Sequence, residues 1–554
     1  MDNIRDHYNK QLSSLKNERE SFIGHYQELS QFIKPRRGRF MESDRNKGDK
    51  RYQSIINSVA TQAHKIATAG MLAGTISPAR PWFALETHDP GMMERQEVKD
   101  WLDDVERTLR AIFNQSNFYG QAPALLGELL LFGTGAMSHV DDFENVARFY
   151  THTAGSYMIA QNDRYEVDTV YREFEWTVKQ IVDAFGLPNV SDAVKNSYDK
   201  GNYGAWFPVC HAVEPNGEYK PSGILSIDKP FRSVYFEPGN TGPDKNKLLS
   251  QSGFDEFPLY VPRWELTDGD IYGTDCPGMT ALGDVKGLQI MEKRKAQAVD
   301  KMVAPPLTGP ASLRNSPVNS LPGGLVLYDG DDGKQQLRPI YEVKPQLSDL
   351  RVDMDAVEQR INKAFFVDMF LAITNMEGIQ PRNQLDLMQR NEERLLQLGP
   401  VLERIHSEWL GKLIDRSFSQ ASKAGIFPPP PAILQQGEEL RVKYISSLAM
   451  AQRAVATQGI ERVASFAGNL YQLGFQDAHM KFNGAQAVDE YARAIGVPPS
   501  IIRSDEEVDA MVQQQQQQQA AQQGIVAAQG AADVAKTVSE TKLDGRNLLS
   551  QARR

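Results

Sequence analysis

Two stretches on either side of a short insert decide the fold: residues 279–303, MTALGDVKGLQIMEKRKAQAVDKMV, and residues 345–372, PQLSDLRVDMDAVEQRINKAFFVDMFLA. At ~1.5 Å per residue, two helices of these lengths would span roughly 37 and 42 Å, so they match. Pro305 and Pro306 end the first stretch, and the residues between the two are rich in Gly, Pro and short apolar runs. The sequence therefore predicts an antiparallel helix pair with a small module at its tip, which builds a rod or a channel wall rather than a catalytic pocket.

Length and composition set the limits of the prediction. A chain of 554 residues with 41% hydrophobic and 24% charged side chains has the composition of a globular protein of two to four domains. No run approaches the ~20 apolar residues that cross a bilayer, and two cysteines do not make a disulfide scaffold. The net charge of −10 favours passage of, or transient contact with, DNA over tight binding, because tight binders neutralise phosphates with basic patches.

The N-terminal half predicts a mixed α+β domain. Helices are expected over residues 1–34, 54–72, 94–115, 121–131 and 177–185, and short strands over 146–152, 167–176, 206–213, 233–237 and 259–264. Small residues fill the second helix, so we expect it to be buried, with His64 a satisfied core histidine. The basic segment from Pro35 to Arg51 is either a solvated loop or partner-facing arm, or a nucleic-acid contact, and the sequence leaves both open.

The C-terminal half predicts mainly helices. One is expected over 384–422 with an interruption at Gly399-Pro400, then others over 438–473 and 485–494. A last helix should begin near Ser504, a good N-cap with Glu507 three residues later. It carries seven consecutive glutamines, Gln513 to Gln519, and either packs side by side in an oligomer or is a disordered tail.

The chemistry of an enzyme is missing from the sequence. There is no Gly-x-x-x-x-Gly-Lys-Ser/Thr phosphate loop, which excludes an ATP-driven motor of that class. The nine histidines are scattered, and Cys210-His211 lacks a second pair of metal ligands. We expect no catalytic residue, no metal and no cofactor.

Four blocks of sequence resemble the head–tail connecting (portal) proteins of short-tailed bacteriophages. They are AGMLAGTISPARPWF (69–83); YGTDCPG (272–278) on to Pro305-Pro306; NEERL (391–395) with LGPVLER (398–404) and Asp415-Arg416; and YISSLAMAQR (444–453). Their order and spacing cover roughly residues 20 to 500. The Gln-rich tail lies outside this resemblance.

The resemblance implies an α+β, mainly α, portal fold. Its parts would be N-terminal helices and an α+β wing (1–278), stem helix 1 (279–303), a small β-containing clip (304–344), stem helix 2 (345–372), a channel loop (373–383), a long kinked helix and wing return (384–437), a helical crown (438–503), and a C-terminal helical barrel and tail (504–554).

The resemblance also implies a function. The protein would be a structural ring, usually of twelve subunits, at one vertex of the phage capsid in the virion, assembled in the host cytoplasm. Double-stranded DNA would pass through it during packaging and ejection. Its partners would be the terminase motor, then tail adaptor proteins, and the major capsid and scaffold proteins, with no membrane.

The candidate site residues follow from these parts. The stem candidates for facing the channel are Lys286, Lys293, Arg294 and Lys301, which either brush DNA or pair with the acidic second stem segment. The channel-loop candidates are Asn375, Met376, Glu377, Gln380 and Arg382, and the clip candidates for partner docking are Pro306, Leu313, Arg314 and Leu325. In the second stem segment, Leu350, Met354, Val357, Ile361 and Phe365 form one apolar stripe for helix packing.

Two rival functions stay open at this stage. Another ring-forming virion component, such as a tail adaptor, would not need long paired stem helices and is usually much shorter. A DNA-processing enzyme of the packaging machinery would need the phosphate loop or metal ligands that the sequence lacks.

Overall fold

The computed structural model describes residues 4–40, 50–89, 91–142, 144–239, 247–303, 307–308, 338–339, 347–374, 398–434, 440–445, 463–470, 481–484, 486–488, 542–543 and 546–547, with single residues 491, 508, 511 and 514. The chain forms two compact units. The first joins Met1–His88 to Glu97–Gln452, and the second joins Asp89–Gln96 to Arg453–Arg554.

Four helices open the chain: α1 (Ile4–Phe32), α2 (Val59–Thr75), α3 (Gln96–Gln115) and α4 (Phe118–Phe132). Apolar residues of α3 recur at steps of three and four and are buried: Val98, Leu102, Val105, Leu109 and Ile112. α4 is nearly all apolar and ends at Gly133, whose φ of 73° is the left-handed conformation that glycine adopts without cost. The four helices predicted in this region are therefore present, with ends shifted by a few residues.

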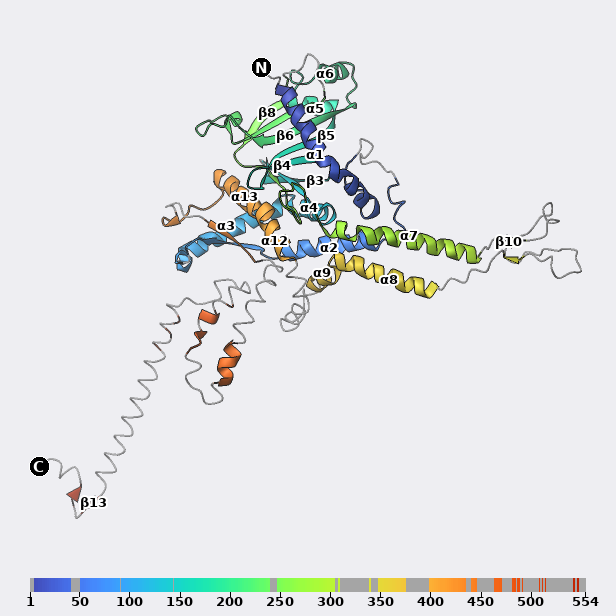
Figure 1. Ribbon diagram of the computed structural model, residues 1–554. Helices are drawn as coiled ribbons and strands as arrows, with labels where there is room; N and C mark the ends of the chain where they lie inside the picture. Colours follow the sequence, from blue (N-terminus) through green and yellow to red (C-terminus); the bar gives the residue numbers. More distant parts are fainter. Residues whose placement is uncertain are drawn as a thin grey trace, which may run out of the picture. The chain divides into compact units, whose positions relative to one another are not determined.

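A five-stranded antiparallel sheet forms the centre of the α+β region. Its order β4-β5-β6-β7-β8 follows the sequence, with strands Tyr157–Gln161, Val167–Thr177, Trp206–Pro215, Phe231–Phe236 and Ser250–Phe254. α1 covers one face, where Tyr8, Leu12 and Leu15 pack on Tyr171 and Phe236 (Figure 1). β5, β6 and β7 match predicted strands; β4 and β8 were not predicted.

A smaller sheet, β3-β2-β9, packs near the other face. Its strands are β2 (Ala136–Asp142), β3 (Val146–His152) and β9 (Leu259–Tyr260). Ala136 and Leu259 from this sheet share one apolar cluster with Ile159, Val170 and Val213 of the larger sheet. β3 and β9 fall on predicted strands, and β2 was missed.

Two short helices close one end of the larger sheet. α5 (Val178–Phe185) starts with a capping box: the Thr177 hydroxyl accepts a hydrogen bond from the Gln180 amide, and the Gln180 side chain accepts one from the Thr177 amide. α6 (Asp192–Asp199) is capped by Ser191. Both pack Val178, Ile181 and Val194 against the sheet, with Val209 of β6 in the same cluster.

The deciding stretches form α7 (Pro277–Val303), α8 (Leu347–Ala364) and α9 (Val367–Thr374). The expectation of one unbroken helix over 345–372 was wrong. The chain turns at Phe366, which has a φ of 54°, so that Phe370 of α9 reaches Gly70 of α2. Between α7 and α8, β10 (Leu307–Thr308) and β11 (Arg338–Pro339) form an antiparallel pair.

Three elements follow as one rod: α12 (Gly399–Ile405), the π-helical turn η5 (His406–Leu410) and α13 (Gly411–Lys423). Downstream, β12 (Leu440–Tyr444) pairs antiparallel with β1 (Phe83–Thr87), with Leu85 opposite Val442. The helix expected to start at Glu438 is thus a strand at its beginning. The apolar and charged residues of β12 alternate, which is the period of a strand.

The second unit is described only in parts. Residues 463–470 are helical, as are residues 486–488, and β13 (Lys542–Leu543) pairs with β14 (Arg546–Asn547). Short 3-10 turns occur at η2 (Met92–Glu94) here and at η3 (Ser226–Asp228) in the first unit. Most of the predicted Gln-rich helix lies outside the described residues. Among the described helices, none combines the length and apolar character that a membrane span requires.

Candidate functional site: a helix pair and its anchors

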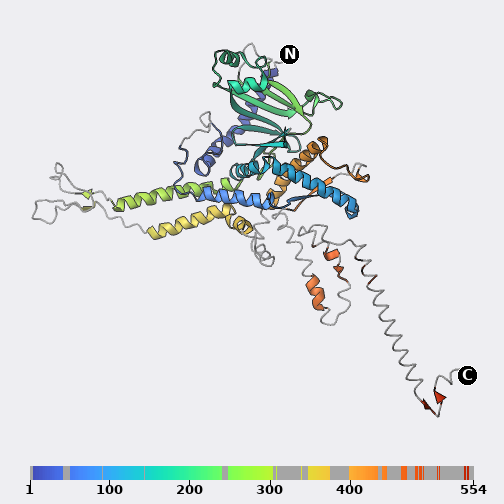
Figure 2. The ribbon, with the colours of Figure 1, turned by 180° about the vertical axis from the view of Figure 1, so that it is seen from behind.

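α7 and α8 lie side by side and project together from the body of the protein, α7 running outward and α8 returning, as both views show (Figures 1 and 2). The predicted apolar stripe of α8 is confirmed, because Met354, Val357, Ile361 and Phe365 are buried and Leu350 is partly buried. α7 contributes Ala281, Leu282, Val285 and Leu288 to the buried core. The inner halves of the two helices are therefore held by the apolar core that they share with α2.

A polar anchor fixes the start of α2 to both helices. The side-chain oxygen of Gln289 on α7 accepts hydrogen bonds from the amides of Ile56 and Asn57, at 2.7 and 2.8 Å. The Asn57 side chain donates to Glu358 of α8 at 2.8 Å and to Glu292 of α7 at 3.3 Å. Gln289 is only 5% exposed, so these bonds are shielded from water. Sequence reasoning missed this anchor, because no local pattern marks an isolated Gln or Asn as a contact.

Charged side chains also join the helices. Arg360 of α8 donates to both carboxylate oxygens of Asp284 on α7, with a shortest distance of 2.9 Å. The lysines of α7 take other partners: Lys286 contacts Glu28 of α1 at 3.1 Å, and Lys295 contacts Glu292 of its own helix. The ion pair between α7 and α8 is therefore the reverse of the expected one, because its cation comes from α8. Among the described residues no lysine of α7 pairs with a carboxylate of α8, and pairing with a neighbouring subunit stays a prediction.

The predicted site residues fall into two groups. Lys293, Arg294 and Lys301 are exposed on the outer half of α7, whereas Lys286 is half-buried against α1. The outer half also exposes apolar side chains, among them Ile290, Val299 and Val303. The channel-loop candidates Asn375, Met376, Glu377, Gln380 and Arg382, and the clip candidates Pro306, Leu313, Arg314 and Leu325, lie outside the described residues.

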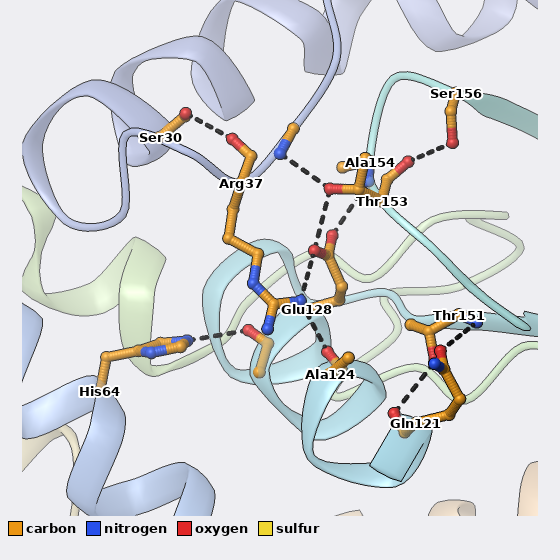
Figure 3. Close-up of polar contacts among 12 residues, drawn as sticks. Ser30, Arg37, His64, Gln121, Ala124, Glu128, Thr151, Thr153, Ala154 and Ser156 are labelled. Atoms are coloured by element: carbon orange, nitrogen blue, oxygen red, sulfur yellow. Dashed lines mark hydrogen bonds and ion pairs between the residues drawn. The ribbon is translucent and has the colours of Figure 1, made fainter. Parts of the chain in front are cut away.

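The basic segment after α1 is bound to the body of the protein at Arg37 and Gly38, so the expectation of a solvated or partner-facing arm was wrong there, although the side chain of Arg39 is exposed. The guanidinium of Arg37 donates to Glu128 and to the carbonyl of Ala124, both at 2.9 Å (Figure 3). The amides of Gly38 and Arg39 donate to Thr153 and Ala154. The segment therefore links α1 to α4 and β3.

Glu128 is the centre of this linkage and is fully buried on α4. It also accepts hydrogen bonds from the Thr153 hydroxyl and the Ala154 amide, both at 2.9 Å. Nearby, Gln121 fixes the backbone of Thr151 through its side chain (Figure 3). Sequence reasoning did not single out Glu128, and a glutamate within an apolar helix was the available signal, because such a side chain is seldom buried without a partner.

His64 confirms its predicted structural role. Its ring lies against α4 with Nε2 2.8 Å from the carbonyl oxygen of Gly127 (Figure 3). Burial lowers the pKa of His64 to about 4, and the charges of Lys34 and Arg37 also lower it. The ring is therefore neutral at pH 7, and Nε2–H is the donor to Gly127.

The described part of the chain has neither a metal-ligand cluster nor a reactive thiol. No group of His, Cys, Asp and Glu side chains there has the arrangement to hold a metal ion. Both cysteines are buried and unpaired. Burial raises the pKa of Cys276 to about 12 and that of Cys210 further, so neither thiol supplies a thiolate nucleophile at pH 7.

Comparisons with known proteins agree with this picture. The chain is 42% identical over 541 residues to the portal protein of Salmonella phage epsilon15, covering 98% of this chain and 96% of that protein. It is 40% identical over 543 residues to the "Probable portal protein" of Bordetella phage BPP-1, with the same coverage. Among solved structures, the "Neck of empty GTA particle computed with C6 symmetry" shares 11% identity; the alignment covers 56% of this chain and 65% of that one, and its TM-score of 0.28 carries no argument about the fold.

A family model also matches nearly the whole chain. The family described as "Bacteriophage head to tail connecting protein" matches residues 5–502. Proteins of this family are structural, non-enzymatic components of the phage head–tail junction. The chain therefore belongs to the bacteriophage head-to-tail connecting proteins.

Proposed function

We propose that this protein forms a ring at one vertex of the capsid and that double-stranded DNA enters and leaves the head through it. The terminase motor docks on the ring during packaging, and tail adaptor proteins replace the motor afterwards. Membership of the head-to-tail connecting family supports the connector role, and the projecting pair α7–α8 supports the channel.

The helix pair is the observation that carries the proposal. Its inner half is fixed by the apolar stripe of α8, by the Gln289–Asn57 anchor and by the Arg360–Asp284 ion pair. Its outer half extends beyond that core and has no catalytic group among its described residues. A rigid rod that is held at one end suits the wall of a channel, in which copies of the same pair stand side by side around a rotation axis.

The exposed apolar residues of the pair support ring formation. Ile290 is 52% exposed, Val303 is 80% exposed and Val352 of α8 is 67% exposed. Apolar side chains concentrated on one projecting element mark surfaces that a neighbouring chain covers. In a ring, the neighbour is another copy of this chain, and each copy both offers and receives the same contact.

Light scattering together with negative-stain electron microscopy tests the proposal. A ring of twelve chains, each of 62.0 kDa, would have a mass of about 740 kDa and a central hole. A tail adaptor would also form a ring, so the images must show a narrow stem projecting from a wider body. A protein that stays near 62.0 kDa at high concentration and with scaffold protein present would contradict the proposal.

A further inference from the structure

A cavity of about 890 Å³ lies between the two sheets and the loop that follows α1. Its walls include Ser138 and His152 of the smaller sheet, Arg172 and His211 of the larger sheet, and Arg36 to Arg39 of the loop. The volume falls within the range of small-molecule sites. The portal role leaves this cavity without a function.

The charge of the walls is opposite to that of the whole chain. Five arginines line the cavity, against two carboxylates, in a protein of net charge −10: Arg36, Arg37, Arg39, Arg51 and Arg172 against Glu128 and Glu173. Both carboxylates already accept from cations, Glu128 from Arg37 at 2.9 Å and Glu173 from Lys16 at 2.7 Å. Among the described residues of the lining, arginines therefore outnumber carboxylates.

Arg172 is the arginine of the lining whose surroundings favour binding of an anion. It stands on β5, and its guanidinium lies 4.6 Å from the centre of the Phe174 ring and 3.1 Å from Nε2 of His152. Burial lowers the pKa of Arg172. The side chain is partly buried, and among the described residues no carboxylate forms an ion pair with it. A cation that is removed from water without a counter-ion is costly.

The two histidines do not add to the charge. Burial, and next the neighbouring Arg172, lower the pKa of His211 to about 3 and that of His152 well below its usual range. Both rings are therefore neutral at pH 7. Nε2 of His211 lies 2.9 Å from the Ser233 hydroxyl, and His152 contacts the Ser138 hydroxyl, so each ring has a polar partner from the walls.

Three aromatic residues of the walls already contact other side chains. Tyr235 stacks on His211, with ring centres 4.0 Å apart and planes 3° apart. Trp176 stacks on Phe185 at 5.8 Å, and Phe174 carries Arg172. Arginine, by contrast, suits oxyanions, because its planar fork donates two parallel hydrogen bonds to a phosphate.

We propose that this cavity binds a polyvalent oxyanion of phosphate chemistry, with Arg172 from β5 and Arg39 from the loop among its donors. The bound anion balances the arginine cluster and ties the loop after α1 to both sheets. The cavity contains none of the residues proposed to face the DNA channel.

Binding is tested on the full-length protein with inorganic phosphate and pyrophosphate, against chloride at equal ionic strength. Calorimetry and the unfolding temperature are the readouts, because an anion that binds only the folded protein raises that temperature. We expect pyrophosphate to bind the parent protein, and R172Q to weaken binding by at least about tenfold, the loss of one charged hydrogen-bonding partner. R39Q should weaken binding too, and it keeps the test valid if R172Q does not fold.

Two further arms complete the test. R107Q is the matched control, because Arg107 is an exposed arginine of α3 paired with Asp103, and it should bind pyrophosphate like the parent. A short DNA duplex without terminal phosphates, bound in an Arg172-dependent manner, would identify the oxyanion as a backbone phosphate instead of a free ion. No binding of pyrophosphate, or binding that R172Q and R39Q leave unchanged, would overturn the proposal.

Discussion

Glu128 joins three segments that are far apart in the sequence. It stands on α4 and receives hydrogen bonds from Arg37 after α1, and from Thr153 and Ala154 after β3. A buried carboxylate is stable only when its charge is paired and its oxygens accept hydrogen bonds. Because all three donors converge on one side chain, removing it leaves several buried donors without a partner.

We expect E128A to lower the free energy of unfolding of the first unit by about 3–5 kcal/mol, the usual cost of breaking a buried ion pair. Urea unfolding followed by tryptophan fluorescence measures the change. The control is E218A, which removes the carboxylate that Arg232 contacts at 3.0 Å at the surface, where a pair contributes about 0–1 kcal/mol. Equal losses in the two variants would show that Glu128 does not organise this region.

His64 gives the first unit a defined dependence on pH. The pKa is 6.5 for an ordinary histidine and about 4 for the folded protein, so the unfolded chain binds the proton first as pH falls. The contribution of neutral His64 to the free energy of unfolding is therefore fully present above pH 6.5 and is lost as the pH falls from 6.5 to 4. At pH 5 the loss amounts to about 2 kcal/mol relative to pH 7.5.

The variant H64Q keeps a donor for Gly127 but cannot be protonated. We expect the parent to lose about 2 kcal/mol more than H64Q between pH 7.5 and pH 5, as measured by urea midpoints at the two pH values. The other buried histidines, such as His139 and His211, titrate equally in both proteins and cancel in the difference. Parallel losses in the two proteins would contradict the buried, neutral state of His64.

At the scale of elements, α2 and α9 pack at a distance that only glycine permits. A Cβ atom at Gly70 would lie 2.3 Å from the Cβ of Phe370, which is a backbone-fixed position and not the end of a flexible side chain. The turn at Phe366 and this close packing occur together. The turn directs Met369 and Phe370, both fully buried, toward the small residues of α2.

G70A should therefore destabilise the first unit by about 1–3 kcal/mol, the usual cost of overpacking a core. The matched control is G24A on α1, where nothing lies within 4 Å of the added Cβ. There, replacing a helical glycine by alanine should stabilise by up to about 1 kcal/mol. The measurement is the thermal unfolding temperature of both variants and the parent. A G70A protein as stable as G24A would refute the close α2–α9 contact.

The elements also show what sequence reasoning can and cannot reach. The apolar stripe from Met354 to Phe365 was predictable, because helical spacing is a local signal. The turn at Phe366 was not, since the contact that it allows is with Gly70, some 300 residues earlier. β12 carried a local signal in its alternation, but its strand conformation depends on pairing with β1, and the surrounding sequence favoured a helix.

The candidate site divides in the same way. The charges of the two stem segments predicted that lysines of the first pair with carboxylates of the second, whereas the ion pair that joins the helices runs from Arg360 of α8 to Asp284 of α7. Lys286 contacts Glu28 of α1 because α1 passes beside α7, an arrangement that depends on the tertiary fold. Asn57 and Gln289 could not be predicted at all, because these two ordinary polar residues form their hydrogen bonds only when the start of α2 packs against α7 in the folded protein.

At the scale of the whole molecule, the first unit combines a rigid α+β body with a projecting helix pair. In a closed ring, each exposed cation of the helix pair would be repeated once per subunit. Lys293, Arg294 and Lys301 would then each form a belt of positive charge. DNA carries one negative charge per ~1.7 Å of its axis, and a belt of moderate charge would guide it without holding it. The role of Lys293, Arg294 and Lys301 in facing the channel stays a prediction that assembled particles can test.

We expect the triple variant K293Q/R294Q/K301Q to form normal rings, because all three side chains are exposed and distant from the buried core. Its particles should contain less DNA, since the loss of three cations per subunit removes attraction for phosphates throughout the channel. The control K179Q/K195Q/K200Q changes the net charge equally on exposed lysines of the α+β body. Nuclease-protected DNA per particle is the measurement, and equal DNA content in both variants and the parent would place the three cations away from the channel.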